Sequence, residues 1–253
     1  MPRTSPVTNP SGPVLPELEF LGKLANATSR RSFLQWAGVT VGVAALASCS
    51  GNDDSTGTTL STGVDLGAGD VGLLNYAYAL EQLEAAFYIQ VISTPYSGIT
   101  SAETAILTDI RDHEVTHREF LKAALGANAI AALSVTFASI TFSSRASVLG
   151  AAKTFEDLGV SAYNGAAKLF TISTNGTAYL GLAGKIVSVE ARHAAAIRDL
   201  LNPLTASFAG DDVVDANGLD VTNTPATVLN SSHAGAFVTT KITYSNLPNG
   251  GTQ

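Results

Sequence analysis

The feature that most constrains this chain is a repeat of ionisable residues inside apolar sequence. Glu81 is followed seven residues later by Tyr88, and Glu156 is followed seven residues later by Tyr163, an offset of 75 between the pairs. A Glu-x-x-His pattern also occurs twice, at an offset of 76. Each half of the chain therefore carries one segment with a single Glu and one with Glu-x-x-His. The acids and imidazoles of the repeat are Glu81, Glu114, His117, Glu156, Glu190 and His193.

The four segments that carry the repeat have the composition of helices. The first is rich in Ala and Leu, and Pro95 follows it. Thr100 and Glu103 have the spacing of a capping box, which predicts a second helix that runs to Gly126. Similar patterns predict a third helix and a fourth, and Pro203 stands just after the fourth. The predicted helices span residues of about 70–93, 101–126, 147–171 and 177–201.

The links between these helices predict how they connect. Two links are short, but about 19 residues separate the second helix from the third. Extended chain covers roughly twice the distance per residue of a helix, so this link can return along the length of a helix. Val135, Phe137, Ile140 and Phe142 predict that it lies along an apolar surface. The connectivity is that of an all-α four-helix bundle with one long crossover.

The charged residues of the repeat are predicted to face the interior of this bundle. At about 100° per residue, Glu114 and His117 lie about 30° from the centre of the apolar stripe of their helix, and His113 lies about 70° from it. Glu190 and His193 also lie among apolar positions. Four Glu buried together would repel unless they were protonated or neutralised. Two divalent cations would supply four matching positive charges.

Two other interpretations compete with this one. The sequence HEVTH at residues 113–117 matches H-E-x-x-H, in which two His bind zinc and the Glu is the general base of a zinc metalloprotease. His113 has no counterpart in the repeat, because Val189 stands there, and Phe120 and Ala123 occupy positions where a longer zinc pattern needs Gly and His. Alternatively, the buried polar residues are satisfied by their neighbours alone. The matching offsets disfavour that interpretation.

The first 48 residues predict an export signal with a disordered, Pro-rich start. The sequence SRRSFL, which contains Arg30 and Arg31, resembles the twin-arginine signal, whose pathway carries folded proteins. The sequence LASC resembles a bacterial lipobox and would place a lipid on Cys49. Cleavage after Ala47 would instead leave a soluble protein. Either outcome predicts export to the periplasm or cell envelope, with the twin-arginine machinery as a partner and a membrane reached through the lipid.

The remaining sequence completes the predicted organisation. The net charge of −7 and the lack of a basic stripe argue against nucleic acid as a partner. Residues 203–253 contain an acidic stretch and two weakly strand-like runs, near Val228 and at 236–244, which predict an irregular or β-like extension. The predicted parts are the export signal at 1–48, a flexible tether at 49–69, the bundle at 70–202 and the extension at 203–253.

The helices and their acids resemble the ferritin-like superfamily, in which two helices each give a Glu and two each give Glu-x-x-His to a dimetal site. The sequences FEDLGVSAYNGA and VEARHAAAIRDLL are similar to exported, desiccation-associated ferritin-like proteins of bacteria. The similarity covers residues 70 to about 202. It implies that the chain binds two iron or manganese ions and that Glu114 and Glu190 bridge them. The six implied ligands are Glu81, Glu114, His117, Glu156, Glu190 and His193.

Residues beside these six have less definite expected roles. Tyr88 and Tyr163 lie about 20° around their helices from Glu81 and Glu156, so they would hydrogen bond near the site, take part in redox steps, or simply pack as aromatic rings. Glu84 has no counterpart in the repeat and is expected at the site entrance, next to the ligands, or at the surface. His113 is expected at the surface or next to a ligand. Related bundles often have an acid at the position of His113. The presence of a histidine there puts the redox potential of the centre in doubt.

The resemblance implies several functions. The first is redox chemistry with oxygen or peroxide, of a ferroxidase or peroxide-decomposing type, in protection against stress or desiccation. The second is a non-catalytic envelope protein that metal ions stabilise. Iron storage is a weaker third, because nothing in the sequence identifies a cage-forming surface. Metal ions and small oxidants are the expected ligands, and an oligomer is compatible with the sequence.

Overall fold

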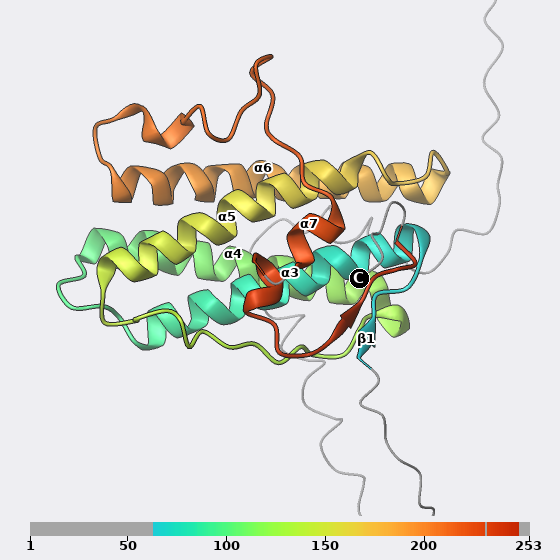
Figure 1. Cartoon of the computed structure of the whole chain (residues 1–253), viewed down its shortest axis with the longest axis horizontal. Helices are drawn as coiled ribbons and strands as arrows, with labels where there is room; N and C mark the ends of the chain where they lie inside the picture. The colour runs from blue at the N-terminus through green and yellow to red at the C-terminus, as the bar shows by residue number, and fades with distance from the viewer. Residues whose placement is uncertain (1–62, 231, 248–253) are drawn as a thin grey trace, which may run out of the picture. The chain divides into compact units, whose positions relative to one another are not determined.

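A computed structural model of the chain describes residues 63–230 and 232–247, in which four long helices form the body. In Figure 1 they run from cyan through green and yellow to orange. The first packs mainly on the second and the third on the fourth, and the two pairs meet through further contacts between the first and third and between the second and fourth. These helices are α3 (Gly69–Ser93), α4 (Ser101–Leu125), α5 (Arg145–Ala167) and α6 (Thr174–Leu201). The predicted all-α four-helix bundle with a long crossover is confirmed.

Local sequence signals account for most helix ends. The Thr100 side chain accepts a hydrogen bond from the Glu103 amide, and the Glu103 carboxylate accepts one from the Thr100 amide, so the capping box forms as predicted. Gly126 follows α4 with φ of 54°, a conformation that favours glycine. Ser144 and Ser173 cap α5 and α6. The start of α6 is therefore earlier than predicted, and α5 ends earlier, at Ala167.

Helix α3 lies at the centre of the fold. Every residue from Gly72 to Ala85 is buried, because further chain covers the side of α3 that the other helices leave open. Two polar side chains of α3 hold that chain in place. The Asn75 amide donates to the carbonyls of Leu66 and Asn128 and accepts from the amide of residue 130, and the Gln82 side chain accepts from the amide of residue 133. Buried polar side chains here satisfy backbone groups that would otherwise lack partners.

The crossover packs along the bundle as the sequence predicts. Val135, Phe137, Ile140 and Phe142 all lie against the main hydrophobic core. The Phe137 ring meets the Phe87 ring edge-on, with centroids 5.7 Å apart. The apolar side chains of this irregular segment therefore replace a helix as the cover on one side of α3.

The C-terminal extension returns to this same side. It contains short helical turns η2 (Ala206–Ala209) and η3 (Ala234–Ala236), helix α7 (Pro225–Leu229) and strand β2 (Ile242–Thr243), which pairs in parallel with β1 (Val64–Asp65). The run near Val228, predicted to be strand-like, is instead helical, because Thr224 caps it and Pro225 suits a first helical position. Residues 64–66, which the sequence places in the tether, pair with this strand, and Leu66 is fully buried.

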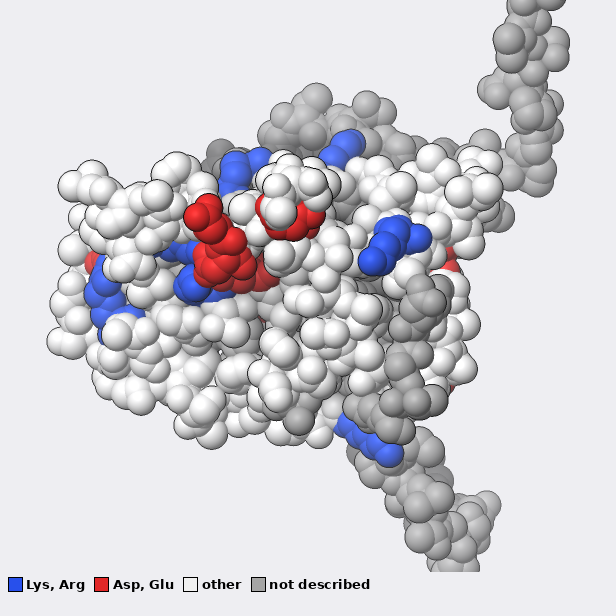
Figure 2. Space-filling view, turned by 45° about the horizontal axis from the view of Figure 1, so that its top comes forward, with Lys and Arg blue, Asp and Glu red and all other residues white. Residues whose placement is uncertain are grey.

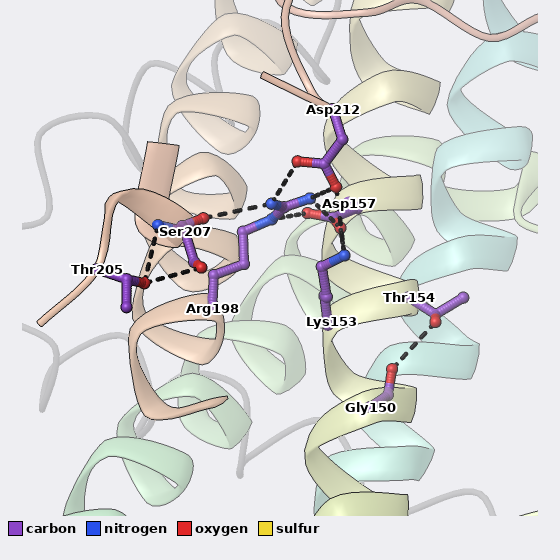
Figure 3. Close-up of polar contacts among 8 residues, drawn as sticks. All are labelled: Gly150, Lys153, Thr154, Asp157, Arg198, Thr205, Ser207 and Asp212. Atoms are coloured by element: carbon purple, nitrogen blue, oxygen red, sulfur yellow. Dashed lines mark hydrogen bonds and ion pairs between the residues drawn. The ribbon is translucent and has the colours of Figure 1, made fainter. Parts of the chain in front are cut away.

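A buried arginine fixes the start of the extension to the bundle (Figure 3). Arg198 of α6 is only 4% exposed. Its guanidinium donates two hydrogen bonds to Asp157 of α5, at 2.8 and 2.7 Å, and two to Asp212, at 2.9 and 3.0 Å. It also donates to the Ser207 carbonyl. The hydrogen bonds from Arg198 lower the pKa of Asp212. Lys153 adds an ion pair with Asp212 at 3.4 Å.

The surface differs from the interior in how it distributes charge. On the face in Figure 2, acidic and basic side chains lie next to one another in small groups on a largely uncharged surface. No continuous basic stripe crosses the described residues on this face. The acids of the repeat, in contrast, are inside the bundle.

Several predictions concern residues that the structure does not describe. The export signal, with Arg30 and Arg31, the lipidation site Cys49 and most of the tether lie outside the described residues. Within 63–230 and 232–247, none of the helices has the length and apolar character needed to span a bilayer.

Candidate metal centre

Four glutamates from four helices meet inside the bundle. Glu81 of α3, Glu114 of α4, Glu156 of α5 and Glu190 of α6 each have no exposed surface. They come together because each stands on the inward face of its helix, among apolar residues that bury it. Helical periodicity predicted this placement for Glu114 and Glu190, and the sequence repeat predicted it for Glu81 and Glu156.

The acids and imidazoles form two overlapping groups, each with one potential ligand atom per residue and all such atoms within 4.8 Å of one another. Glu114 and Glu190 belong to both groups. Two carboxylates shared between neighbouring groups are what a pair of bridged metal ions needs. The first group is Glu81, Glu114, His117 and Glu190, and the second is Glu114, Glu156, Glu190 and His193.

The two imidazoles turn the same atom towards the carboxylates. Nδ1 of His117 lies 2.9 Å from Glu190, 3.5 Å from Glu81 and 3.6 Å from Glu114. Nδ1 of His193 lies 2.8 Å from Glu114, 3.5 Å from Glu156 and 4.0 Å from Glu190. Each histidine is therefore nearest to the shared glutamate of the opposite helix. The arrangement repeats the symmetry that the sequence shows.

Two tyrosines bridge the halves of the repeat. The Tyr88 hydroxyl of α3 donates to Glu156 of α5 at 2.5 Å, and the Tyr163 hydroxyl of α5 donates to Glu81 of α3 at 2.5 Å. Both tyrosines are buried. The sequence predicted that these rings lie near the acids, but it did not show that each one reaches the glutamate of the other half. Each hydroxyl occupies one carboxylate oxygen and leaves the second free.

Comparison with known proteins assigns this bundle to a family. Residues 69–203 match the family model of the ferritin-like domain, which is more than half of the 253 residues. The chain belongs to the ferritin-like domain family. The matched range contains the four long helices and all six residues of the repeat. Among curated proteins, no sequence matches this chain significantly.

The cluster of this ferritin-like domain is compatible with a dimetal site. Its imidazole nitrogens lie within ion-pair distance of the carboxylates, yet several buried atoms have no hydrogen-bond partner. Burying so many unpaired acceptors is costly unless cations complete their coordination. The unpartnered atoms include Oε2 of Glu81 and Glu156, both carboxylate oxygens of Glu114 and Glu190, and Nδ1 of His117 and His193. The structure brings all six predicted residues together, and their role as ligands remains a prediction.

Without metal, the ferritin-like cluster holds protons. Burial raises the pKa of Glu81 to about 7 and raises that of Glu190 well above its usual range. Burial opposes the charged form of His193, but the Glu114 and Glu156 carboxylates outweigh it and raise the pKa to about 10. The pKa of Glu114 is about 2, because its two histidine neighbours outweigh its burial. Cations that bind here would therefore displace protons.

His113 lies outside the two groups. Its Nδ1 is 2.9 Å from Nε2 of His193, and the two rings stack with centroids 5.1 Å apart. Of the two positions expected for His113, at the surface or next to a ligand, the structure shows the second. Ligating histidines commonly bind a second partner through the ring nitrogen that faces away from the metal. His113 belongs to neither group of potential ligands, and its Nδ1 meets this nitrogen of His193, so the geometry does not favour zinc bound by both histidines of HEVTH.

Glu84 lies inside the bundle near the cluster and not at the surface, which was one of its expected positions. It is 4% exposed, and burial raises its pKa well above the usual range. A β-carbon added to Gly159 would lie 3.1 Å from Glu84 Oε1 and 3.5 Å from Glu190 Oε2, so both carboxylates border the same space. In the sequence, Glu84 was distinguished only by having no counterpart in the second half of the repeat.

Proposed function

We propose that this ferritin-like domain binds two iron or manganese ions and uses them for redox chemistry with oxygen or peroxide. The observation that carries the proposal is the sharing of Glu114 and Glu190 by two adjacent groups of potential ligands. Shared carboxylates hold two ions close together. His117 and Glu81 would complete one position, and His193 and Glu156 the other.

A pair of redox-active ions supplies two electrons at one place, which is what one hydrogen peroxide needs, with two protons, to become two waters. The residues of the chain set the conditions for that exchange. The four Glu of the two groups are fully buried, so the protein around them keeps bulk water away from the centre. Tyr88 and Tyr163 hold one oxygen of Glu156 and of Glu81, which leaves the other oxygen directed to the centre.

The surroundings of the cluster support a small reactant. An apolar cavity of about 20 Å³ lies against Tyr163, with Leu121 and Ile186 among its lining residues. This volume has room for about one water-sized molecule, and the cavity reaches the cluster only through Tyr163, whose hydroxyl donates to Glu81. A small oxidant fits such a space better than a bulky organic substrate does.

The proposed place of action is outside the cytoplasm. The twin-arginine-like sequence with Arg30 and Arg31 and the lipobox-like sequence ending at Cys49 support export to the periplasm or envelope, with a lipid anchor. A signal that carries folded proteins would let metal be loaded before export. The likeness to desiccation-associated proteins supports a role in protection against drying or oxidative stress.

The test combines metal analysis with turnover. The full chain is purified, loaded with ferrous or manganous ions, and measured for metal stoichiometry by elemental analysis and for ferrous oxidation and peroxide consumption. We expect two ions per chain and turnover that Glu156→Ala abolishes without loss of helicity. Asp109→Asn, an exposed acid on α4 that also removes one charge, is the control and should leave both quantities unchanged. Turnover that persists in Glu156→Ala contradicts the proposal.

A non-catalytic role is a second candidate, and the full burial of the four glutamates favours it. A closed site can bind ions that only stabilise the fold of an envelope protein. That function predicts two tightly bound ions, a large rise in the melting temperature on loading and no consumption of oxygen or peroxide. The same loaded protein distinguishes the two candidates.

A further inference from the structure

The repeat is broken at one position that borders the centre. Glu84 of α3 and Gly159 of α5 are separated by the same 75 residues as Glu81 and Glu156, so they occupy matching places in the two halves. One half therefore places a carboxylate beside the cluster, and the other half places no side chain there.

The structure shows why the two positions depend on each other. Glu84 Oε1 would lie 3.1 Å from a β-carbon at position 159, and Glu84 Oε2 would lie 3.7 Å from it. The first distance is tighter than an ordinary contact, so the missing side chain of Gly159 leaves room for the carboxylate. Glu190 Oε2 borders the same space at 3.5 Å. Glu84 therefore extends across the interface between α3 and α5 towards a residue that both groups of potential ligands share.

The carboxyl group of Glu84 is buried without a complete set of partners. Its Oε2 has no exposed surface of note and no hydrogen-bond partner. A buried, unpartnered carboxylate oxygen is energetically unfavourable unless a cation or donor satisfies it. Burial raises the pKa of Glu84 most, and the charges of the cluster acids, Glu190 first among them, raise it further. A cation at the centre would supply the missing partner and offset this repulsion.

We propose that Glu84 is the fifth carboxylate of the centre and binds one of its two ions, which makes the two metal positions unequal. The inference rests on the dimetal centre proposed above and adds a residue that the six-residue pattern does not contain. Five carboxylates face the four positive charges of two divalent ions. The excess negative charge favours the binding of one further positive charge, as a proton or as a metal in a higher oxidation state.

Manganese affinity tests this assignment independently of turnover. The full chain is titrated with Mn²⁺ against a chelator, which gives a dissociation constant for each ion. In Glu84→Gln, a substitution of similar shape, we expect one ion to bind about 10-fold or more weakly, the size of effect seen when groups around a metal site are removed. The affinity for the other ion should change much less. The control Asp109→Asn should change neither constant.

A second variant keeps the acid and removes its space. Gly159→Ala adds the β-carbon that presses on Glu84 Oε1, so we expect it to weaken the same ion, by less than Glu84→Gln does. Circular dichroism checks that both variants fold.

The outcomes separate this inference from the proposed function. If the wild type binds two ions and Glu84→Gln binds both as tightly, the assignment of Glu84 is wrong while the dimetal centre stands. If the wild type binds fewer than two ions, both fail. A wild type that binds two unequal ions, one of them weakened by Glu84→Gln, supports the assignment even if no redox turnover is found.

Discussion

At the scale of single residues, two equally buried tyrosines of α3 differ in whether their hydroxyl groups form a hydrogen bond. Tyr88 donates to Glu156, whereas the Tyr76 hydroxyl has no hydrogen-bond partner. Both rings are at most 1% exposed. The two tyrosines therefore bury nearly the same apolar ring surface and differ by one hydrogen bond.

This pair gives a matched test of that hydrogen bond. Tyr88→Phe leaves a buried oxygen of Glu156 without its donor, so we expect it to lower the free energy of unfolding by about 1–3 kcal/mol. Tyr76→Phe removes a hydroxyl that has no partner, and we expect no loss or a small gain. Chemical denaturation of the metal-free protein measures both. Equal losses in the two variants would show that the hydroxyl contact with Glu156 is not what stabilises the fold.

At the scale of elements, Arg198 connects three of them. Arg198 belongs to α6. Its guanidinium binds Asp157 of α5 and Asp212 of the extension, which follows η2. Asp212 itself is half exposed, with a side chain at 59%. The contact with Asp157 therefore contributes more to stability than the one with Asp212, because water screens the exposed pair.

We expect Arg198→Met to lower the free energy of unfolding by about 1–3 kcal/mol and to increase proteolysis within residues 203–224. Arg192→Met is the control, because Arg192 is an exposed arginine of the same helix that contacts only Ser188 among the contacts described. Limited proteolysis with mass spectrometry, together with denaturation, measures both effects. An extension that stays protected in Arg198→Met would mean that its apolar contacts alone hold it.

The elements also show what the sequence could and could not predict. Signals within a single segment were enough for the capping box of Thr100 and Glu103, and for the inward placement of Glu114 and His117. They failed at Val228, where helix capping by Thr224 outweighs the strand propensity of the residues. Contacts between segments had no local signal. The stacking of His113 on His193 and the crossing of the tyrosines depend on how the helices are packed.

At the scale of the whole molecule, the cluster links stability to pH. In the metal-free protein the pKa of Glu81 is raised to about 7, that of His193 to about 10, and those of Glu84, Glu190 and His117 are also raised. Between pH 5 and 8 the folded protein therefore binds more protons than the unfolded chain. Stability falls with rising pH wherever that holds, by about 1.4 kcal/mol per pH unit for each extra proton. Glu114, with its pKa lowered, is ionised in both states over this range and does not contribute.

We therefore expect the metal-free protein to become less stable from pH 5 to pH 8, and manganese to stabilise it more at the higher pH, because the ions replace the protons. Denaturation curves at several pH values, with manganese and with a chelator, measure both trends. A metal-free protein whose stability rises steadily over this range would mean that the cluster does not hold the protons assigned to it.

The crossing of the tyrosines also makes the two halves of the fold depend on each other. Each half of the repeat carries a helical hairpin in which a Glu, a Glu-x-x-His and a tyrosine match those of the other half, but the hydroxyl of this tyrosine donates to the glutamate of the other half. A separate half with this sequence pattern could complete neither hydrogen bond alone and would need a second copy of itself. A single chain that holds both halves allows their sequences to differ. Glu84 opposite Gly159 is a difference that two identical copies could not have had.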